Sequence, residues 1–395
     1  MAYRIAERMK GAQGSIIREL LKLANEPGMI SFGGGSPDPD AFPSEAVARI
    51  SEEAMRRQPA KILQYGISEG YPPLRETLKK HLQATEGISF EDNDILITSG
   101  GQQCADLAAK LFVNEGDTVL VESPSFIGCM NAFRSYGGRL QGVKLHEDGV
   151  DLEALEKAFR QPGISLFYII PTFQNPSGFT TSAEKRRKVY ELAQKYGVMI
   201  LEDNPYGEVR FGGEWIAPIK AQDPDGRVIY MGSFSKTMAP GLRVGFVVMP
   251  KDLFNQFKIA KQATDVHSSN LFQLACDEFL NHWDYPAHLA SIRALYRKKG
   301  LLMYDEIKKH AHPSLRFAKP QGGFFMMAYL PEGQDAMPFV QEALKRKVIT
   351  VPGSAFTTDP TQPNNGVRLN FSAPSEEQIV RGAEILGKLS REMLG

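Results

Sequence analysis

The chain has 395 residues, of which 42% are apolar and 23% charged, and its 46 Lys and Arg balance its 46 Asp and Glu. This length predicts a globular protein of two domains, and the neutral balance argues against a protein dedicated to nucleic acid or membrane surfaces. Three widely spaced cysteines, Cys104, Cys129 and Cys276, favour neither a disulfide framework nor a zinc ribbon. Residues 1–15 lack the apolar core of a signal peptide and no apolar run reaches the ~20 residues of a membrane span, so we expect a cytoplasmic protein.

Residues 1–45 contain an amphipathic segment at 15–28 and a glycine-rich and proline-rich loop, "SFGGGSPDPDAFP", at 31–43. The first of these predicts a helix, because its apolar residues recur at helical spacing. We expect this N-terminal part to complete a small domain or to lie across a cleft.

The middle of the chain alternates short apolar runs with amphipathic segments, which predicts a largely parallel sheet with helices on both faces. Strands are expected at 94–99, 118–123, 165–170, 198–203, 227–232 and 243–249, and helices at 101–116, 125–138 and 181–197. The last helix is expected to open with a capping box of Thr181 and Glu184 and to close at Gly197.

From about residue 285 the pattern changes to long charged helices separated by short strands, including "GGFFMMAYL", "VITVPGSAF" and "VRLNFS". This change predicts a smaller α+β domain. The expected division is therefore residues 1–45, a large domain at 46–285 and a small domain at 286–395.

Polar residues follow several of the predicted strands, at the end of the sheet where ligands gather in α/β proteins. Gly100-Gly101-Gln102 opens a helix and could bind a phosphate through its backbone N–H groups, although taken alone a simple glycine turn explains it better. Asn175 precedes a proline and could belong to an ordinary Asn-Pro turn. Asp203 ends an apolar strand, as in magnesium sites, but the phosphate loop that would accompany such a site is missing.

Lys236 lies in the stretch "SFSKTMAPGLRVG", after Ser233 and Ser235 and before Arg243. The SxxK pattern also occurs in serine acyl-enzymes, but no KTG motif follows, and Pro240-Gly241 breaks the helix that the serine would have to open. The nucleotide fingerprints GxxxxGK[ST] and GxGxxG are absent from the sequence.

Taken together, these groups are what pyridoxal 5′-phosphate (PLP) requires. A lysine forms the Schiff base, and a carboxylate keeps the pyridine nitrogen protonated. Asn and Tyr donate to the ring oxygen, and serines, an arginine and a helix N-terminus bind the phosphate. Phe126 could stack on the ring, and Arg368 could hold a substrate α-carboxylate in bidentate fashion.

The sequence resembles the fold-type I PLP-dependent aminotransferases of the class I/II group. The resemblance rests on "SFGGGSPDPDAFP", "LQYGISEGYPPLR", "ITSGGQQ", "PTFQNPSG", "EDNPYGE", "SFSKTMAPGLRVG" and "VRLNFS", which extend from residue 31 to 372. It is similar above all to the 2-aminoadipate (LysN-type) and multi-substrate aminotransferases. The resemblance implies a mostly parallel seven-stranded sheet covered by helices, with a smaller α+β domain.

The resemblance also implies a role for each matching residue. Lys236 would carry the Schiff base and move the proton, Asp203 would face the pyridine nitrogen, and Asn175 and Tyr206 would contact the ring oxygen. Phe126 stands where many relatives have tyrosine. The phosphate would be bound by Gly101, Gln102, Ser233, Ser235 and Arg243, and by Tyr65 of a second copy in a homodimer with shared active sites. Tyr65 and Phe126 could also be plain core aromatics.

For the substrate, the resemblance implies that Arg368 and the backbone of Gly35 bind the α-carboxylate, near Asn175. Ser15 and Arg18 match the positions that bind a distal carboxylate in the 2-aminoadipate type. Arg18 could instead be an exposed arginine on an amphipathic helix.

We therefore expect a cytoplasmic, homodimeric aminotransferase that works by a ping-pong mechanism. Broad specificity for 2-aminoadipate, glutamate, aromatic or branched-chain amino acids is expected, with 2-oxoglutarate as acceptor and no metal. Two alternatives stay open, namely a PLP-dependent C–S lyase and a PLP-binding sensor domain like that of MocR-type regulators. Because the PLP-type motifs begin at residue 31, we expect no DNA-binding domain ahead of them.

Overall fold

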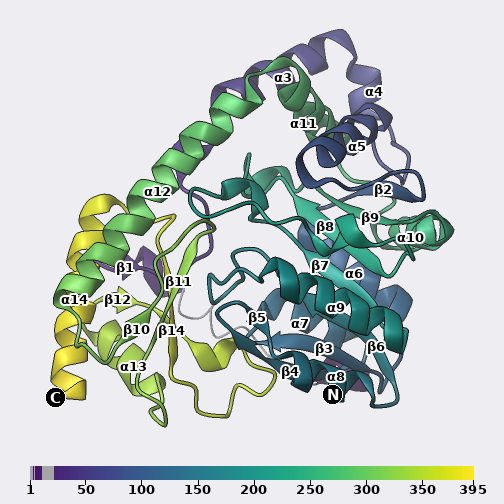
Figure 1. The fold of residues 1–395 in the computed structure, drawn as a ribbon. Helices are drawn as coiled ribbons and strands as arrows, with labels where there is room; N and C mark the ends of the chain where they lie inside the picture. Colours follow the sequence, from purple (N-terminus) through teal and green to yellow (C-terminus); the bar gives the residue numbers. More distant parts are fainter. Residues whose placement is uncertain (1–2, 4, 11–21) are drawn as a thin grey trace.

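The structure is a computed structural model that describes residues 3, 5–10 and 22–395. Its centre is an eight-stranded sheet (Figure 1). The strands, in spatial order, are β2 (Asn93–Thr98), β9 (Gly245–Pro250), β8 (Val228–Ser233), β7 (Met199–Asp203), β6 (Ile164–Ile169), β3 (Thr118–Ser123), β4 (Arg139–His146) and β5 (Gly149–Val150).

The sheet is mostly parallel, as the sequence predicts. Strands β8, β7, β6, β3 and β4 pair in parallel, whereas β9 runs antiparallel between β8 and β2. The resemblance implies seven strands, and the six strands expected from the sequence omit β4 and also β5, a two-residue strand that pairs with the end of β4. Such a short strand leaves no periodic signal in the sequence.

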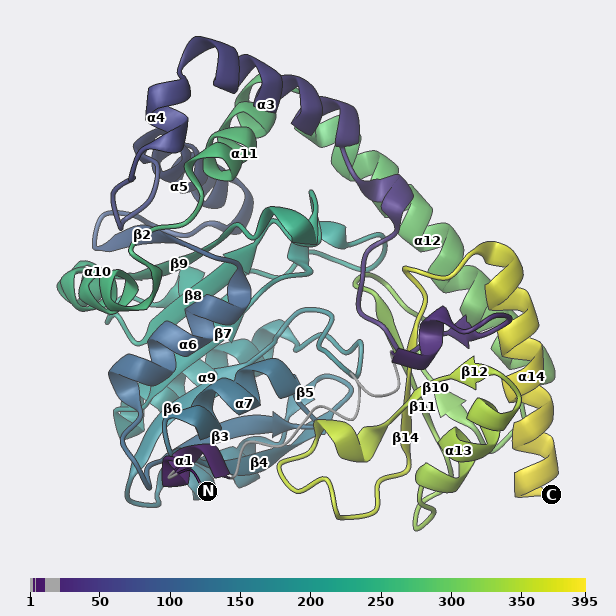
Figure 2. The ribbon, with the colours of Figure 1, turned by 180° about the vertical axis from the view of Figure 1, so that it is seen from behind.

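Helices cover both faces of the sheet because side chains alternate along each strand. Val119 and Val121 of β3 pack on one face, whereas Leu120 packs on the other. Figures 1 and 2 show the two helical layers. One layer contains α6 (Gly101–Phe112), α7 (Ile127–Ser135) and α10 (Lys251–Asp265), and the other contains α8 (Leu152–Phe159) and α9 (Ala183–Tyr196).

Helix α9 begins one residue later than a Thr181 cap would place it. Ser182 is the N-cap and accepts a hydrogen bond from the backbone N–H of Lys185 at 3.3 Å, so the predicted capping box is wrong. Thr181 is buried, and its own N–H donates to the carbonyl of Pro171, which draws it into the core. The predicted end at Gly197 is confirmed, with φ of 71°.

A second, smaller sheet is antiparallel and has the order β10 (Arg316–Phe317), β11 (Phe325–Tyr329), β14 (Gly366–Asn370) and β13 (Val351–Pro352). Beside it, β1 (Ile30–Ser31) pairs in parallel with β12 (Val348–Ile349) (Figure 2). Residues near the N-terminus thus lie beside the small sheet, in a separate two-stranded sheet. The domain boundaries expected from the sequence stay a prediction.

The remaining helices pack around the two sheets: α1 (Glu7–Lys10), α3 (Ser44–Arg57), α4 (Pro59–Leu63), α5 (Pro72–Glu86), α11 (Asn270–His282), α12 (Tyr285–His310), α13 (Met337–Lys345) and α14 (Glu376–Leu394). The 26-residue α12 runs along one side of the molecule, from α3 and α11 beside the large sheet to α14 beside the small one (Figure 1). Among the described residues, none of the helices combines the length and the apolar character needed to cross a bilayer.

Candidate active site

The carboxyl ends of the large sheet's strands open into a cavity of about 590 Å³. Twelve of the predicted site residues line it: Gly35, Gly101, Gln102, Phe126, Asn175, Asp203, Tyr206, Ser233, Ser235, Lys236, Arg243 and Arg368. The cavity lies where parallel strands end, which is the general place for ligands in open α/β sheets.

Lys236 lies in a turn that follows β8, so its side chain projects from the sheet edge into the cavity. Its Nζ donates to the carbonyl oxygen of Gly35 at 2.9 Å. Burial, together with the positive charges of Arg368 and Arg243, lowers the pKa of Lys236 to about 8. The turn contains no helix that starts at Ser233, which agrees with rejecting the serine acyl-enzyme interpretation.

Asp203 is the last residue of β7, and its side chain is 6% exposed at the cavity wall. It accepts a hydrogen bond from the Tyr168 hydroxyl at 2.7 Å. Burial raises the pKa of Asp203 to about 7, against the opposing effects of Tyr168 and Lys236. A cation bound beside this carboxyl group would lower its pKa and keep it ionised.

Elsewhere on the cavity wall, helix α6 begins at Gly101, after Gly100 with φ of 85°. A Cβ on Gly100 would lie 2.5 Å from Nη2 of Arg243, so only glycine leaves room for that guanidinium. Arg243 itself has φ of 52°, which is uncommon outside glycine and typical of functional sites.

The hydroxyls of Ser233 and Ser235 lie beside this helix start. They are 2.9 Å apart, and the N–H of Ser235 donates to the hydroxyl of Ser233 at 3.1 Å. Together with Arg243 and the first N–H groups of α6, they offer donors on several sides that are suited to an anion.

Arg368 of β14 approaches the cavity from the small sheet and is 3% exposed. Its Nη1 donates to Asn175 Oδ1 at 3.0 Å, and its Nη2 to the carbonyl oxygen of Gly33 at 2.7 Å. The guanidinium carbon lies 4.4 Å from the ring centre of Phe325 and 4.6 Å from that of Phe356, which fixes its plane. Burial lowers the pKa of Arg368 to about 10, so it stays charged at neutral pH.

Arg368 still has a free donor, because its Nε has no hydrogen-bond partner among residues 3, 5–10 and 22–395. A buried guanidinium with an unused donor beside a cavity is suited to binding a carboxylate.

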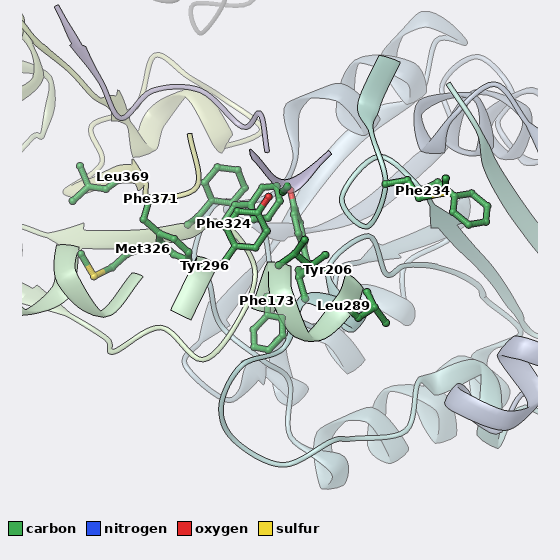
Figure 3. Close-up of a cluster of buried hydrophobic side chains, with 14 of the residues drawn as sticks. Phe173, Tyr206, Phe234, Leu289, Tyr296, Phe324, Met326, Leu369 and Phe371 are labelled. Carbon is green, nitrogen blue, oxygen red and sulfur yellow. The ribbon is translucent and has the colours of Figure 1, made fainter. Parts of the chain in front are cut away.

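Tyr206 lies against the rings of Phe324 and Phe325, with centroid distances of 5.6 and 6.0 Å. Figure 3 shows Tyr206, Phe324 and Tyr296 gathered at the junction between the two sheets. Burial raises the pKa of the Tyr206 hydroxyl, and a hydrogen bond with Asn175 opposes that shift. Tyr206 and Asn175 are thus brought together, as the sequence predicts.

Three predicted residues are not placed in the cavity. Tyr65 is 82% exposed, and its ring lies 5.9 Å from that of His267 in an edge-on contact, outside the lining of the cavity of its own chain. Ser15 and Arg18 lie outside the described residues.

The structure also brings in residues that sequence reasoning missed, notably Tyr168, Phe325 and Asn131. Tyr168 carried one usable signal, because a tyrosine within a fully buried strand needs a partner for its hydroxyl. Phe325 and Asn131 look like ordinary core and helix residues in the sequence. No group of acidic, histidine or cysteine side chains that could hold a metal ion occurs in the part of the chain that the structure describes.

With this geometry in hand, the chain can be compared with known proteins. The profile of the family described as "Aminotransferase class I and II" matches residues 27–386. Aromatic-amino-acid aminotransferase 1 of Thermococcus litoralis is 36% identical, over 98% of this chain and 94% of its own length.

Two crystal structures have closely similar folds. Kynurenine aminotransferase of Pyrococcus horikoshii, in complex with PMP, is 37% identical with a TM-score of 0.94, over 99% of this chain and 98% of that one. LysN, an α-aminoadipate aminotransferase of Thermus thermophilus complexed with N-(5′-phosphopyridoxyl)-L-leucine, is 34% identical with a TM-score of 0.90 over the same shares.

Proposed function

This chain belongs to the class I and II aminotransferase family and is a PLP-dependent enzyme, and we propose that it works by a ping-pong exchange with broad amino-acid specificity. In the first half-reaction an L-amino acid leaves its amino group on the enzyme, and in the second a 2-oxo acid such as 2-oxoglutarate collects it. The observation that carries this proposal is the convergence of Lys236, Asp203 and Arg368 on one cavity.

The residues on the cavity wall fit the cofactor. The donors at the start of α6, with Ser233, Ser235 and Arg243, suit a phosphate dianion, and the buried carboxylate of Asp203 suits a protonated ring nitrogen. When bound, PLP supplies an electron sink for the electron pair released when a bond at the substrate's α-carbon breaks.

We assign the proton transfer to Lys236. With a pKa lowered to about 8, its Nζ reaches the neutral form near physiological pH and can accept a proton at the α-carbon and return it. The carbonyl oxygen of Gly35, 2.9 Å away, holds Nζ in place.

Arg368 orients the substrate in this proposal. Its guanidinium is fixed between two phenylalanine rings and has an unpartnered Nε in the described structure, so a substrate α-carboxylate would find a rigid, charged partner. Asn175 Oδ1 already accepts from Nη1 of Arg368 and would hold this guanidinium in a fixed position relative to Tyr206.

The proposed substrates include acidic amino acids, with Arg18 as the partner of the distal carboxylate and Ser15 beside it. This part rests on the similarity to LysN, since both residues lie outside the described structure. Replacing Arg18 by alanine should raise KM for glutamate about tenfold or more, because a charged hydrogen bond is lost, and leave KM for phenylalanine nearly unchanged. Unchanged glutamate kinetics would refute the role of Arg18, and Arg49→Ala, at an exposed ion pair, is the control.

We also propose a homodimer with shared active sites. Four large apolar side chains are exposed around one corner of the molecule, namely Leu63, Tyr65, Ile67 and Val266, and Tyr65 meets the ring of the neighbouring His267. Such a patch is typical of a protein interface, and a second copy would bring Tyr65 to its phosphate site. A cytoplasmic location stays a prediction.

Absorption spectroscopy of the purified enzyme with PLP tests the proposal directly. L-glutamate, L-2-aminoadipate, L-phenylalanine and L-leucine are added separately, and conversion of the cofactor to its pyridoxamine form is expected with more than one of them. Release of pyruvate and ammonia without an oxo acid would indicate a C–S lyase instead. Bound cofactor that no amino acid converts, together with DNA binding, would favour a sensor.

A further inference from the structure

Residues 32–38 pass beside the cavity, which Gly35 lines, and we call this segment the glycine strap. Its carbonyl oxygens contact both cations that the reaction uses: Gly33 accepts from Arg368 Nη2 at 2.7 Å, and Gly35 accepts from Lys236 Nζ at 2.9 Å. The position of this backbone therefore helps to set the position of both side chains.

Residues 33–35 of the strap are three consecutive glycines, so they have no side chains that could hold this part of the backbone in place. Glycine backbone has more conformational freedom than any other, so this segment must be fixed from its ends. At one end Phe32 is fully buried and its carbonyl accepts from the N–H of Asn370 at 2.8 Å. The contacts at the other end therefore decide whether the carbonyls of Gly33 and Gly35 keep their positions.

At that other end, Asp38 forms a buried ion pair with Lys299 of helix α12. The two residues are 6% and 5% exposed. Lys299 Nζ also donates to the carbonyl oxygen of Ser372 at 3.0 Å, and the Ser372 hydroxyl donates to the carbonyl oxygen of Ser36 at 2.8 Å. The backbone N–H of Asp38 donates to the hydroxyl of Tyr296, also on α12, at 3.3 Å.

Stability alone does not explain this pair. A buried ion pair is on average no more stabilising than a well-packed apolar pair, because both charges lose their hydration. An ion pair also fixes a direction, because the Lys299 side chain must point at the Asp38 carboxylate. Here that direction ties the strap to α12, a helix that packs along both halves of the molecule (Figure 1).

We propose that Asp38 and Lys299 are a positioning pair, which holds the glycine strap so that the carbonyls of Gly33 and Gly35 orient Arg368 and Lys236 for the amino-acid substrate. The inference rests on the proposed role of Arg368 in binding the α-carboxylate. Neither residue of the pair lines the cavity, so they act through the strap and not by contact with substrate.

The test compares Lys299→Met and Asp38→Asn with the wild-type holoenzyme. We expect KM for the amino acid to rise roughly 10- to 100-fold through Arg368, because a small misplacement of binding groups has effects of that size, and kcat to fall by a smaller factor through Lys236. Binding of 3-phenylpropanoate, a carboxylate without an amino group, should weaken by the same factor in calorimetry. Amide hydrogen exchange of residues 32–38 should speed up.

Two controls separate positioning from stability. Lys298, next to Lys299 on α12, forms an exposed ion pair with Glu376 of α14. Lys298→Met removes this pair and should leave KM unchanged. The double variant Asp38→Asn/Lys299→Met leaves no buried charge unpaired. It should recover the melting temperature but keep the raised KM.

If the double variant also recovers KM, or if the single variants melt earlier with unchanged KM, the pair is a stability element and the inference is wrong. Should Lys299→Met fail to fold, Tyr296→Phe removes one strap contact without burying a charge, and an unchanged KM and exchange rate there would overturn the inference as well. Arg368→Lys tells the two proposals apart. If that variant binds 3-phenylpropanoate as the wild type does, the proposed role of Arg368 in binding the carboxylate is wrong.

Discussion

The wall of the cavity formed by the large sheet takes its polar groups from successive strand ends, whereas the opposite wall gathers Arg368 and the glycine strap from two distant parts of the chain. Asp203 ends β7, and Lys236 follows β8, the next strand of the sheet. Arg368 and Asn175 meet only because the two sheets pack together. The first wall is set by local chain geometry and is proposed to serve the cofactor. The second depends on tertiary packing and is proposed to serve the substrate.

If this division is correct, changes on the large-sheet wall should abolish the chemistry, and changes on the other wall should mainly alter substrate affinity. The largest effect is expected for Lys236→Ala, which removes the amine that moves the proton. We expect kcat to fall by roughly 10⁴-fold. Lys251→Ala, at an exposed lysine that begins α10, is the control and should retain full activity. Substantial remaining turnover in Lys236→Ala would contradict the assignment.

The next largest effect is expected at Asp203. Asp203→Asn keeps the shape of the side chain but removes the charge that would face the ring nitrogen, so kcat should fall by roughly 10²- to 10³-fold. Glu202→Gln is a matched control, because the neighbouring carboxylate points away from the cavity and accepts from the backbone N–H groups of Ile219 and Lys220. That variant should lose stability and keep its kcat. Equal loss of kcat in both variants would remove the distinction between the two positions.

On the second wall, Arg368→Lys should raise KM for the amino acid by roughly 10- to 100-fold, with a smaller change in kcat. Lysine keeps the charge but cannot bind a carboxylate in bidentate fashion or fill the space between Phe325 and Phe356. Steady-state kinetics at saturating oxo acid measure the split. A fall in kcat as large as that of Asp203→Asn would contradict the proposed difference between the two walls.

The smallest effect concerns the apoprotein and its dependence on pH. The pKa of Lys236 is about 8 in the folded state and near 10.5 in the unfolded chain, so folding becomes less favourable as pH falls from 10.5 towards 8. Lys236→Met removes this penalty. The melting temperature of the variant should exceed that of the wild-type apoprotein by about 2–4 °C at pH 7, and the difference should shrink at pH 10.5. A difference that does not depend on pH would show that packing, not charge, is responsible.

The contrast between the walls also explains what the sequence reveals. Asp203, Lys236 and the start of α6 were predictable, because parallel strands deliver their carboxyl ends to one edge of a sheet. Gly35 was proposed only from the resemblance, and Arg368 only after the other PLP-binding groups had been recognised, since nothing local marks an arginine in a short strand as a ligand-binding residue. The Asp38–Lys299 pair left no trace at all, because its partners are 261 residues apart.

Tertiary packing also accounts for the errors. Thr181 has the residue type of a helix cap, but its burial against Pro171 leaves the capping role to Ser182. Tyr168 looks like one more core aromatic until β6 is placed next to β7, where its hydroxyl reaches Asp203. Propensity and motif describe neighbours along the chain, and these contacts belong to neighbours in space.

Helix α12 has a consequence for how the molecule melts. At 1.5 Å per residue its 26 residues extend about 39 Å. Near its start His288 contacts the carbonyl oxygen of Thr237, one residue from Lys236, and further along Lys299 contacts Asp38. Neither sheet can lose its order without removing partners of this helix. Calorimetry should therefore record a single cooperative transition, with no intermediate in which one sheet stays intact while the other has melted.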